Sequence, residues 1–197
     1  MSTAEPLNPP VAAFVTANEL LHISVQLHNE GKRCELVRGE LVVMSPTKGP
    51  HGVVTAEVHG LLYMHLRGKS LGSLFAAETG FLVSVNPDTV RAPDIAFVRR
   101  DRIEALGLPA SFFPEAPTLA VEVVSPSESA KEVHEKAKMW IESGCGAVWL
   151  VWPGDRTVTD YRSLDNIRVL TADQTLEGGD AVPGFSAKVA DLFVGLS

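Results

Sequence analysis

The chain has 197 residues, of which 45% are hydrophobic and 21% charged, a composition typical of a globular protein with a sizeable core. The formal net charge of −7 disfavours a protein that binds nucleic acid through its overall charge, although it leaves room for a local basic groove. No apolar run reaches the ~20 residues that cross a bilayer, and the N-terminus lacks the pattern of a signal peptide. We therefore expect a cytoplasmic protein with no membrane segment.

The N-terminal part is predicted to be a tail followed by a capped helix. Residues 1–12 are polar and proline-rich, which indicates a disordered tail, and 13–197 are expected to form a single domain. Thr16 and Glu19 have the spacing of a capping box and predict a helix that continues to Asn29.

Strand-like and helical patterns then alternate up to residue 118. In order, we expect strands 33–36 and 40–44 joined at Arg38-Gly39, a loop 45–50, a helix 51–67, a strand 73–85, a turn 86–88, a strand 91–98, a helical turn 101–106 and a loop 107–117.

The centre of the chain predicts a strand–helix–strand unit. An almost unbroken apolar run, 119–124, has the length and composition of a strand buried on both faces. The helix 130–143 carries an apolar stripe at 3.6-residue spacing, and 147–152 is a second apolar strand. Such a unit implies two parallel strands joined by a right-handed crossover.

Shorter elements complete the chain. We expect an antiparallel strand 157–161, a strand 167–170, a turn at Gly178-Gly179 and a short amphipathic helix near 186–193. The order of elements predicts an α/β (mixed α+β) fold with a central sheet flanked by helices.

Glu122 lies in the middle of the apolar strand 119–124. An unpaired carboxylate buried there costs several kcal/mol, so a metal ion, a cation or a proton must compensate it. Lys136 borders the apolar stripe of the helix that follows, where its stem can pack while its ammonium group reaches the sheet. The two side chains are predicted to be neighbours.

Asp94 after Pro93, Glu122 on the next strand and Lys136 on the following helix together resemble the signature of the PD-(D/E)xK nuclease superfamily. The position of that signature's lysine holds Val124 here. A lysine displaced onto the next helix resembles the Uma-two family of endonucleases.

Further segments resemble that family across most of the chain, from about residue 16 to 195. They are Glu35-Leu36, Gly39-Glu40-Leu41, Met44-Ser45-Pro46, His51, Ser125-Pro126-Ser127, Glu135-Lys136, Gly144 and Trp149-Leu150-Val151. Two positions depart from it: Glu132 stands where an Asp is usual and Trp152 where an Asp is common.

The resemblance implies a restriction-endonuclease-like core and a Mg²⁺-dependent or Mn²⁺-dependent endonuclease that hydrolyses phosphodiester bonds in DNA. Asp94 and Glu122 are the expected metal ligands, aided by the Val123 carbonyl. Lys136 is expected to orient the attacking water or to stabilise the pentavalent phosphate. His51 and Glu40 are candidate accessory residues, and Glu57 is another carboxylate that can approach the metal.

Each residue also has a structural interpretation. Asp94 can be an ordinary turn residue, Glu122 can face water on a sheet edge, and Lys136 can pair with Glu132 on the helix surface.

Two other functions stay open. One is a non-catalytic nuclease-like domain that binds nucleic acid or a protein partner, for instance as a homodimer. The other is a metal-dependent phosphohydrolase of a small substrate, which suits an acidic protein.

Overall fold

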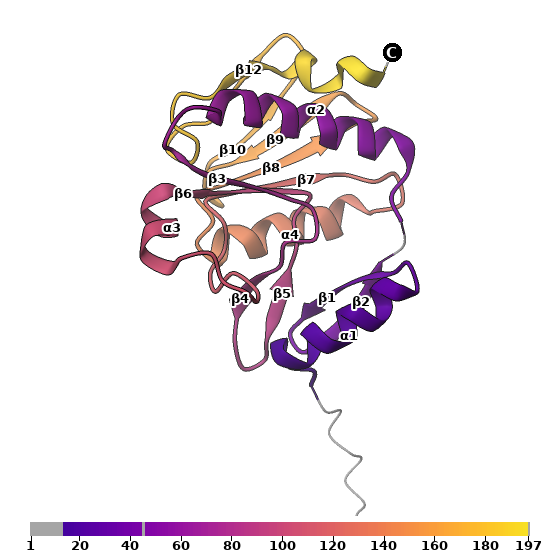
Figure 1. Cartoon of the computed structure of the whole chain (residues 1–197). Coiled ribbons are helices and arrows are strands. Elements are labelled where there is room, and N and C mark those ends of the chain that lie inside the picture. The colour runs from indigo at the N-terminus through magenta and orange to yellow at the C-terminus, as the bar shows by residue number, and fades with distance from the viewer. Residues whose placement is uncertain (1–13, 45, 197) are drawn as a thin grey trace, which may run out of the picture.

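The computed structural model describes residues 14–44 and 46–196, and the predicted tail 1–12 lies outside them (Figure 1). The helices are α1 (Ala17–Asn29), α2 (Gly49–Leu66), α3 (Arg100–Leu106), α4 (Ala130–Glu142) and the 3-10 helix η1 (Val189–Leu196). The strands are β1 (Arg33–Val37), β2 (Glu40–Met44), β3 (Gly72–Ala76), β4 (Phe81–Ser84), β5 (Thr89–Arg91), β6 (Ile95–Arg99), β7 (Leu119–Val123), β8 (Ala147–Trp152), β9 (Thr157–Tyr161), β10 (Ile167–Leu170), β11 (Thr175–Glu177) and β12 (Ser186–Lys188).

A six-stranded sheet in the order β10-β9-β8-β7-β6-β3 forms the centre of the molecule. The β7–β8 pair is parallel, as the strand–helix–strand pattern predicts, and the other neighbours are antiparallel. In Figure 1, α2 covers one face of this sheet and α4 the other. The predicted mixed central sheet flanked by helices is confirmed.

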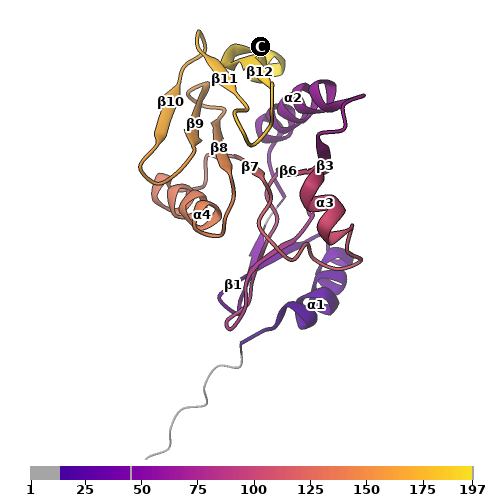
Figure 2. The ribbon, with the colours of Figure 1, turned by 90° about the vertical axis from the view of Figure 1, so that its left-hand side faces the viewer.

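A second, four-stranded sheet was not predicted. Its order is β2-β1-β5-β4, and α1 packs on it through a small core that includes Leu20, Leu36 and Val90. We call α1, β1, β2, β4 and β5 the small lobe. Figure 2 shows α1 and β1 at one end of the molecule, away from β8, β9 and β10.

Side-chain alternation along β7 divides the main core in two. Val121 and Val123 belong to the cluster that contains residues of α2, and Ala120 belongs to the cluster that contains Trp140 of α4. Because successive strand residues point to opposite faces, Glu122 lies on the same face as Ala120, towards α4.

Two predicted strands are wrong, and both errors have the same cause. The predicted strand 73–85 is two strands, β3 and β4, in different sheets, and Glu78 between them has a positive φ of 73°. The predicted strand 91–98 is likewise divided into β5 and β6 around Pro93. In both places the chain crosses between the small lobe and the central sheet, a long-range event that strand patterns do not record.

The C-terminal helix predicted near 186–193 is also wrong in part. Residues 186–188 form β12, which pairs with β11, and the helical segment is the 3-10 helix 189–196. This segment still buries one side, with Leu192 and Phe193 packed against the core that contains α2 residues.

Local signals place α4 as predicted. Ser129 caps the helix by accepting a hydrogen bond from the Glu132 N–H, and the Glu132 carboxylate accepts one from the Ser129 N–H, which completes a capping box. Val133, Ala137 and Trp140 form the buried stripe. The cap thus fixes the start of the helix that carries Lys136.

Replacing Ser129 with Ala should lower the free energy of unfolding by about 1 kcal/mol, because the first turn of α4 loses its side-chain acceptor. Urea denaturation of both proteins measures this difference. Lys131→Ala, an exposed change in the same turn, is the control and should stay within about 0.5 kcal/mol of wild type. Equal effects of the two substitutions would contradict the capping role.

Candidate active site

A cavity of about 420 Å³ lies where β7 ends, between the small lobe, the start of α2 and α4. We call it the active cleft. Its lining includes Arg33, Lys48, His51, Asp94, Glu122, Val123 and Lys136. The three residues of the predicted signature, Asp94, Glu122 and Lys136, span 42 positions of the sequence and line one cavity.

Glu122 is buried, with 6% of its surface exposed, and both of its carboxylate oxygens have partners. Lys136 Nζ donates to Oε2 at 2.7 Å, and the indole Nε1 of Trp140 donates to Oε1 at 2.8 Å. Lys136 and Trp140 are four residues apart on α4, so one face of the helix supplies both donors. These two donors compensate the negative charge of the buried carboxylate, as expected for a Glu in the middle of an apolar strand.

Lys136 reaches the sheet rather than the helix surface. Its side chain is 16% exposed, and Glu132, the alternative partner on the helix, is engaged in the N-terminal cap. Lys131 and Lys138 are exposed, and Lys138 pairs with Glu142 at 3.8 Å. Of the lysines on α4, the structure directs Lys136 into the cleft.

Asp94 precedes β6 and is held by two donors. Its Oδ2 accepts a hydrogen bond of 2.8 Å from the Val123 N–H and lies 3.2 Å from His51 Nε2. Both contacts fall on Oδ2, and Oδ1 has no hydrogen bond to another residue in the described part of the chain. His51, in the first turn of α2, therefore orients Asp94 from the face of the sheet opposite α4.

The pKa values reflect this crowding of charge. Burial raises the pKa of Glu122 to about 7, with the nearby carboxylates of Asp94 and Glu35 adding to the effect and Lys136 opposing it. Burial alone would lower the pKa of Lys136, but Glu122 and Glu35 raise it, so the ammonium stays charged. For Asp94, burial is outweighed by His51 and the Val123 N–H, which lower its pKa.

Glu35 is a buried carboxylate of the site that the sequence reasoning missed. It is 2% exposed and accepts hydrogen bonds from Arg91 at 3.0 Å and from the Ala92 N–H at 2.9 Å. These contacts hold the segment that leads to Pro93 and Asp94. The strand of Glu35 is short and contains Arg33, so it lacks the unbroken apolar run that singled out Glu122 in the sequence.

Other candidates lie elsewhere. Glu40 is exposed at the turn end of the β1–β2 hairpin, opposite Val37, whereas the other end of that hairpin borders the active cleft. Glu57 lies close to Gly195 of η1. Trp140 belongs to the buried core and also donates a hydrogen bond to Glu122.

The donor set fits a hard divalent cation in a mostly hydrated form. No cluster of three His, Cys, Asp or Glu side chains arranged for a metal occurs within residues 14–44 and 46–196. Mg²⁺, however, uses one or two carboxylates and keeps several waters. Asp94 and Glu122 are two candidate carboxylate ligands, and Asp94 Oδ1 accepts no hydrogen bond from another described residue.

The Val123 carbonyl is a candidate third oxygen ligand. Ile95 pairs with Val121, so the same antiparallel register places Pro93 opposite Val123. Proline has no N–H and cannot donate to the Val123 carbonyl, which points to the same side of the strand as the Val123 N–H bound by Asp94. Pro93 thus leaves a backbone oxygen available beside Asp94.

The raised pKa of Glu122 predicts a pH-dependent stability difference between wild type and Glu122→Gln. The wild-type contribution is fully present below the ordinary pKa of 4.5 and is lost as pH rises through about 7, whereas Gln does not titrate. From pH 4.5 to 7.5 the free energy of unfolding of the variant should therefore rise relative to wild type by roughly 3 kcal/mol.

Urea denaturation at several pH values in EDTA measures this change, with the exposed Glu142→Gln as the control. A Glu122→Gln difference that is the same at every pH would show that the buried carboxyl titrates normally.

Comparison with known proteins places these residues in a family. The solved structure of a "putative nuclease belonging to DUF820 from Anabaena variabilis ATCC 29413" superposes with a TM-score of 0.76 at 22% identity, covering 93% of this chain and 99% of that one. None of the curated proteins matches the chain. The model of the Uma2 family, described as "Putative restriction endonuclease", matches residues 18–190. Since that match spans most of the sequence, the chain belongs to the Uma2 family.

Proposed function

We propose that this protein is a Mg²⁺-dependent or Mn²⁺-dependent endonuclease that hydrolyses phosphodiester bonds in DNA. The observation that carries the proposal is the convergence of Asp94, Glu122 and Lys136 in one cleft, with Lys136 Nζ 2.7 Å from the Glu122 carboxylate. Membership of a family described as restriction endonucleases supports the same reaction class.

Asp94, Glu122 and the Val123 carbonyl would hold the metal ion. A bound Mg²⁺ supplies charge compensation for the phosphate and lowers the pKa of a bound water. His51 keeps the Asp94 carboxylate oriented, and the Trp140 indole does the same for Glu122. These contacts fix both carboxylates before any ligand enters.

Lys136 supplies the permanent positive charge of the reaction. Its raised pKa keeps it protonated at neutral pH, so it serves as an electrostatic and hydrogen-bonding group rather than as a base. In this role it stabilises the negative charge that grows on the phosphate as the attacking water adds.

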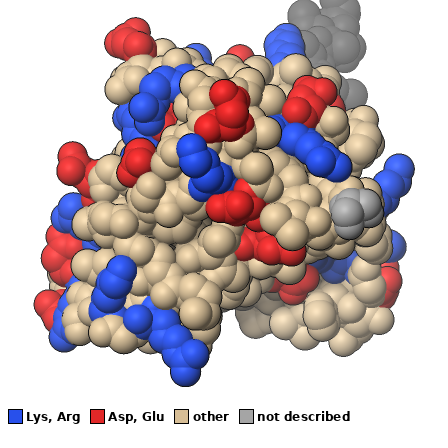
Figure 3. Space-filling view, turned by 90° about the horizontal axis from the view of Figure 1, so that it is seen from above, with Lys and Arg blue, Asp and Glu red and all other residues tan. Residues whose placement is uncertain are grey.

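Although the protein is acidic overall, the cleft has basic side chains that can bind a phosphate backbone. Arg33 and Lys48 also line the cleft. The face that carries α2 and η1 shows acidic and basic side chains side by side rather than a basic patch (Figure 3). We therefore infer that DNA is held by the local cations of the cleft, and that its binding weakens steeply with salt.

Among the described residues, no helix is long and apolar enough to cross a membrane.

Replacing Asp94 with Asn should weaken Mn²⁺ binding, because the cleft loses one of its two anionic ligands. Isothermal titration calorimetry of both proteins measures the change. Wild-type affinity should also fall by about tenfold per pH unit below 7, where a proton competes for Glu122. Identical Mn²⁺ affinity of wild type and Asp94→Asn would remove Asp94 from the site.

Plasmid nicking with Mg²⁺ or Mn²⁺ tests the enzymatic proposal. Lys136→Ala should reduce turnover by at least about a hundredfold, since it removes the charge beside the reacting phosphate. Lys138→Ala, exposed on the same helix, should cleave like wild type. No nicking by wild type under any of these conditions, or equal activity of both variants, would contradict the proposal; a protein that binds DNA without cleaving it would be a non-catalytic nuclease-like domain.

A further inference from the structure

A second cavity, of about 300 Å³, lies in the small lobe and opens beside the active cleft. We call it the lobe pocket. It is enclosed by the C-terminal half of α1, by β1 and by β5, and its lining shares Arg33, Met44 and Ala92 with the active cleft. A ligand in the lobe pocket would therefore lie next to a substrate in the cleft.

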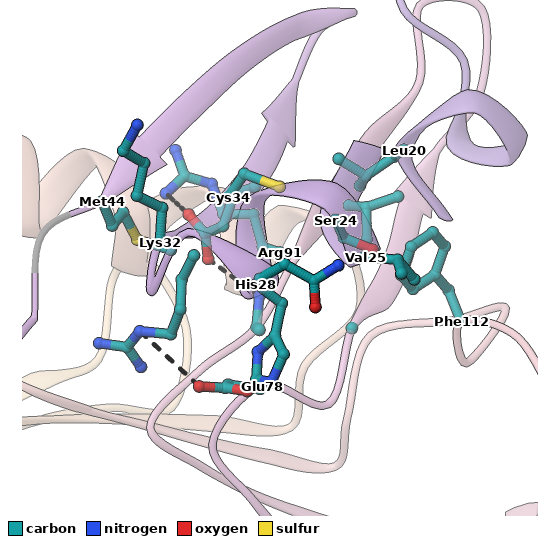
Figure 4. Close-up of a pocket in the computed structure, with 16 residues that line it drawn as sticks. Leu20, Ser24, Val25, His28, Lys32, Cys34, Met44, Glu78, Arg91 and Phe112 are labelled. Atoms are coloured by element: carbon teal, nitrogen blue, oxygen red, sulfur yellow. Dashed lines mark hydrogen bonds and ion pairs between the residues drawn. The ribbon is translucent and has the colours of Figure 1, made fainter. Parts of the chain in front are cut away.

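The lobe pocket has an apolar end and a charged end. Figure 4 shows Leu20, Val25 and Phe112 on one side of it, and Lys32 and Met44 on the opposite side. Met44 pairs with Arg33 across the β1–β2 hairpin, so Arg33 is at the charged end as well. A fitting ligand carries an apolar, compact body and an anionic group at opposite ends.

Two of the cationic side chains at this pocket, Arg33 and Arg91, are not fully engaged, whereas Lys32 forms a solvent-exposed ion pair with Glu30 at 2.8 Å. Arg33 is 28% exposed, and its only ion pair within the described residues is a long one, 3.9 Å to the exposed Glu78. Arg91 binds Glu35 through one terminal nitrogen, whereas its Nε–H is buried and has no hydrogen-bond partner in the described part of the chain. Buried donors are normally satisfied, and the residue that carries this unpaired donor lines the lobe pocket.

The volume limits the size of the ligand. Small-molecule pockets span roughly 300–1,000 Å³, and this one is at the lower end. It can hold one nucleotide unit but not an extended oligonucleotide.

We propose that the lobe pocket binds one nucleotide, with the base against Leu20, Val25 and Phe112 and the phosphate at Arg33 and Lys32. The proposal rests on the proposed function in one respect, namely that a nucleic-acid strand occupies the neighbouring cleft. The same chemistry has two sources, an unpaired nucleotide of the bound strand and a free mononucleotide.

Calorimetric titration of the full chain with three probes in EDTA tests the division into two ends. Removing metal with EDTA keeps metal-mediated phosphate binding in the active cleft out of the measurement. The probes are deoxyadenosine 5′-monophosphate, deoxyribose 5-phosphate, which lacks the base, and deoxyadenosine, which lacks the phosphate.

Phe112→Ala should weaken binding of the mononucleotide by at least about tenfold and leave binding of deoxyribose 5-phosphate unchanged. Arg33→Met should weaken binding of the two probes that carry a phosphate and leave binding of deoxyadenosine unchanged. Arg67→Met, an exposed cation at the end of α2, should change none of them. Val25→Asp, at a side chain that is 62% exposed and tolerant of substitution, is a second test of the apolar end should Phe112→Ala fail to fold.

The source of the nucleotide is found by competition in the Glu122→Gln protein, which keeps a bound strand intact. If mononucleotide displaces a single-stranded deoxyoligonucleotide, the pocket takes a nucleotide of the strand; if both bind independently, it takes the free molecule.

The proposal is overturned if wild type does not bind the mononucleotide at millimolar concentration, or if Val25→Asp and Arg33→Met bind it like wild type. Nicking by wild type in that case would leave the nuclease proposal standing. Pocket binding without any nicking would overturn the nuclease proposal alone.

Discussion

The structure depends on the compensation of one buried charge, the Glu122 carboxylate in the middle of β7. Burial of an ionised carboxylate costs several kcal/mol unless partners replace the lost water. Here Lys136 and Trp140, on one face of α4, donate to its two oxygens. The strand must therefore be followed by a crossover helix that starts at a fixed residue, and the Ser129 cap and the Val133–Ala137–Trp140 stripe provide this. Because burial of the Glu122 carboxylate costs free energy in the metal-free protein, a metal ion that binds to it would offset part of that cost.

The same geometry explains why a lysine on the helix can replace one on the strand. A lysine in place of Val124 would lie on the same face as Glu122, two residues further along β7. Val124 is 6% exposed and belongs to the apolar cluster under α4, so the fold uses that position for packing. Lys136 brings an ammonium group to the same carboxylate from α4, the helix that packs on this face of the sheet, at a distance of 2.7 Å.

Much of this arrangement was predictable from sequence because the signals are local. The capping box at Thr16 predicted the start of α1, and the apolar runs around Glu122 and Trp149 predicted the parallel pair. The errors concern segments that cross between sheets, where Pro93 and Glu78 interrupt patterns that look continuous. Glu35 was missed because its importance comes from Arg91 and Ala92, more than fifty residues away in sequence. The lobe pocket was unpredictable for the same reason, since α1, β1 and β5 meet only in the folded chain.

A crystal structure of the protein soaked with Mn²⁺, with the metal located by anomalous scattering, tests the central claim most directly. We expect an anomalous peak within coordination distance of carboxylate oxygens of both Asp94 and Glu122, with the Val123 carbonyl as a further ligand. The Glu122→Gln crystal should lose the peak. A wild-type crystal that holds Mn²⁺ elsewhere, or none at a concentration that supports nicking, with the Lys136–Glu122 pair intact, would show that the carboxylate is structural and would contradict the account.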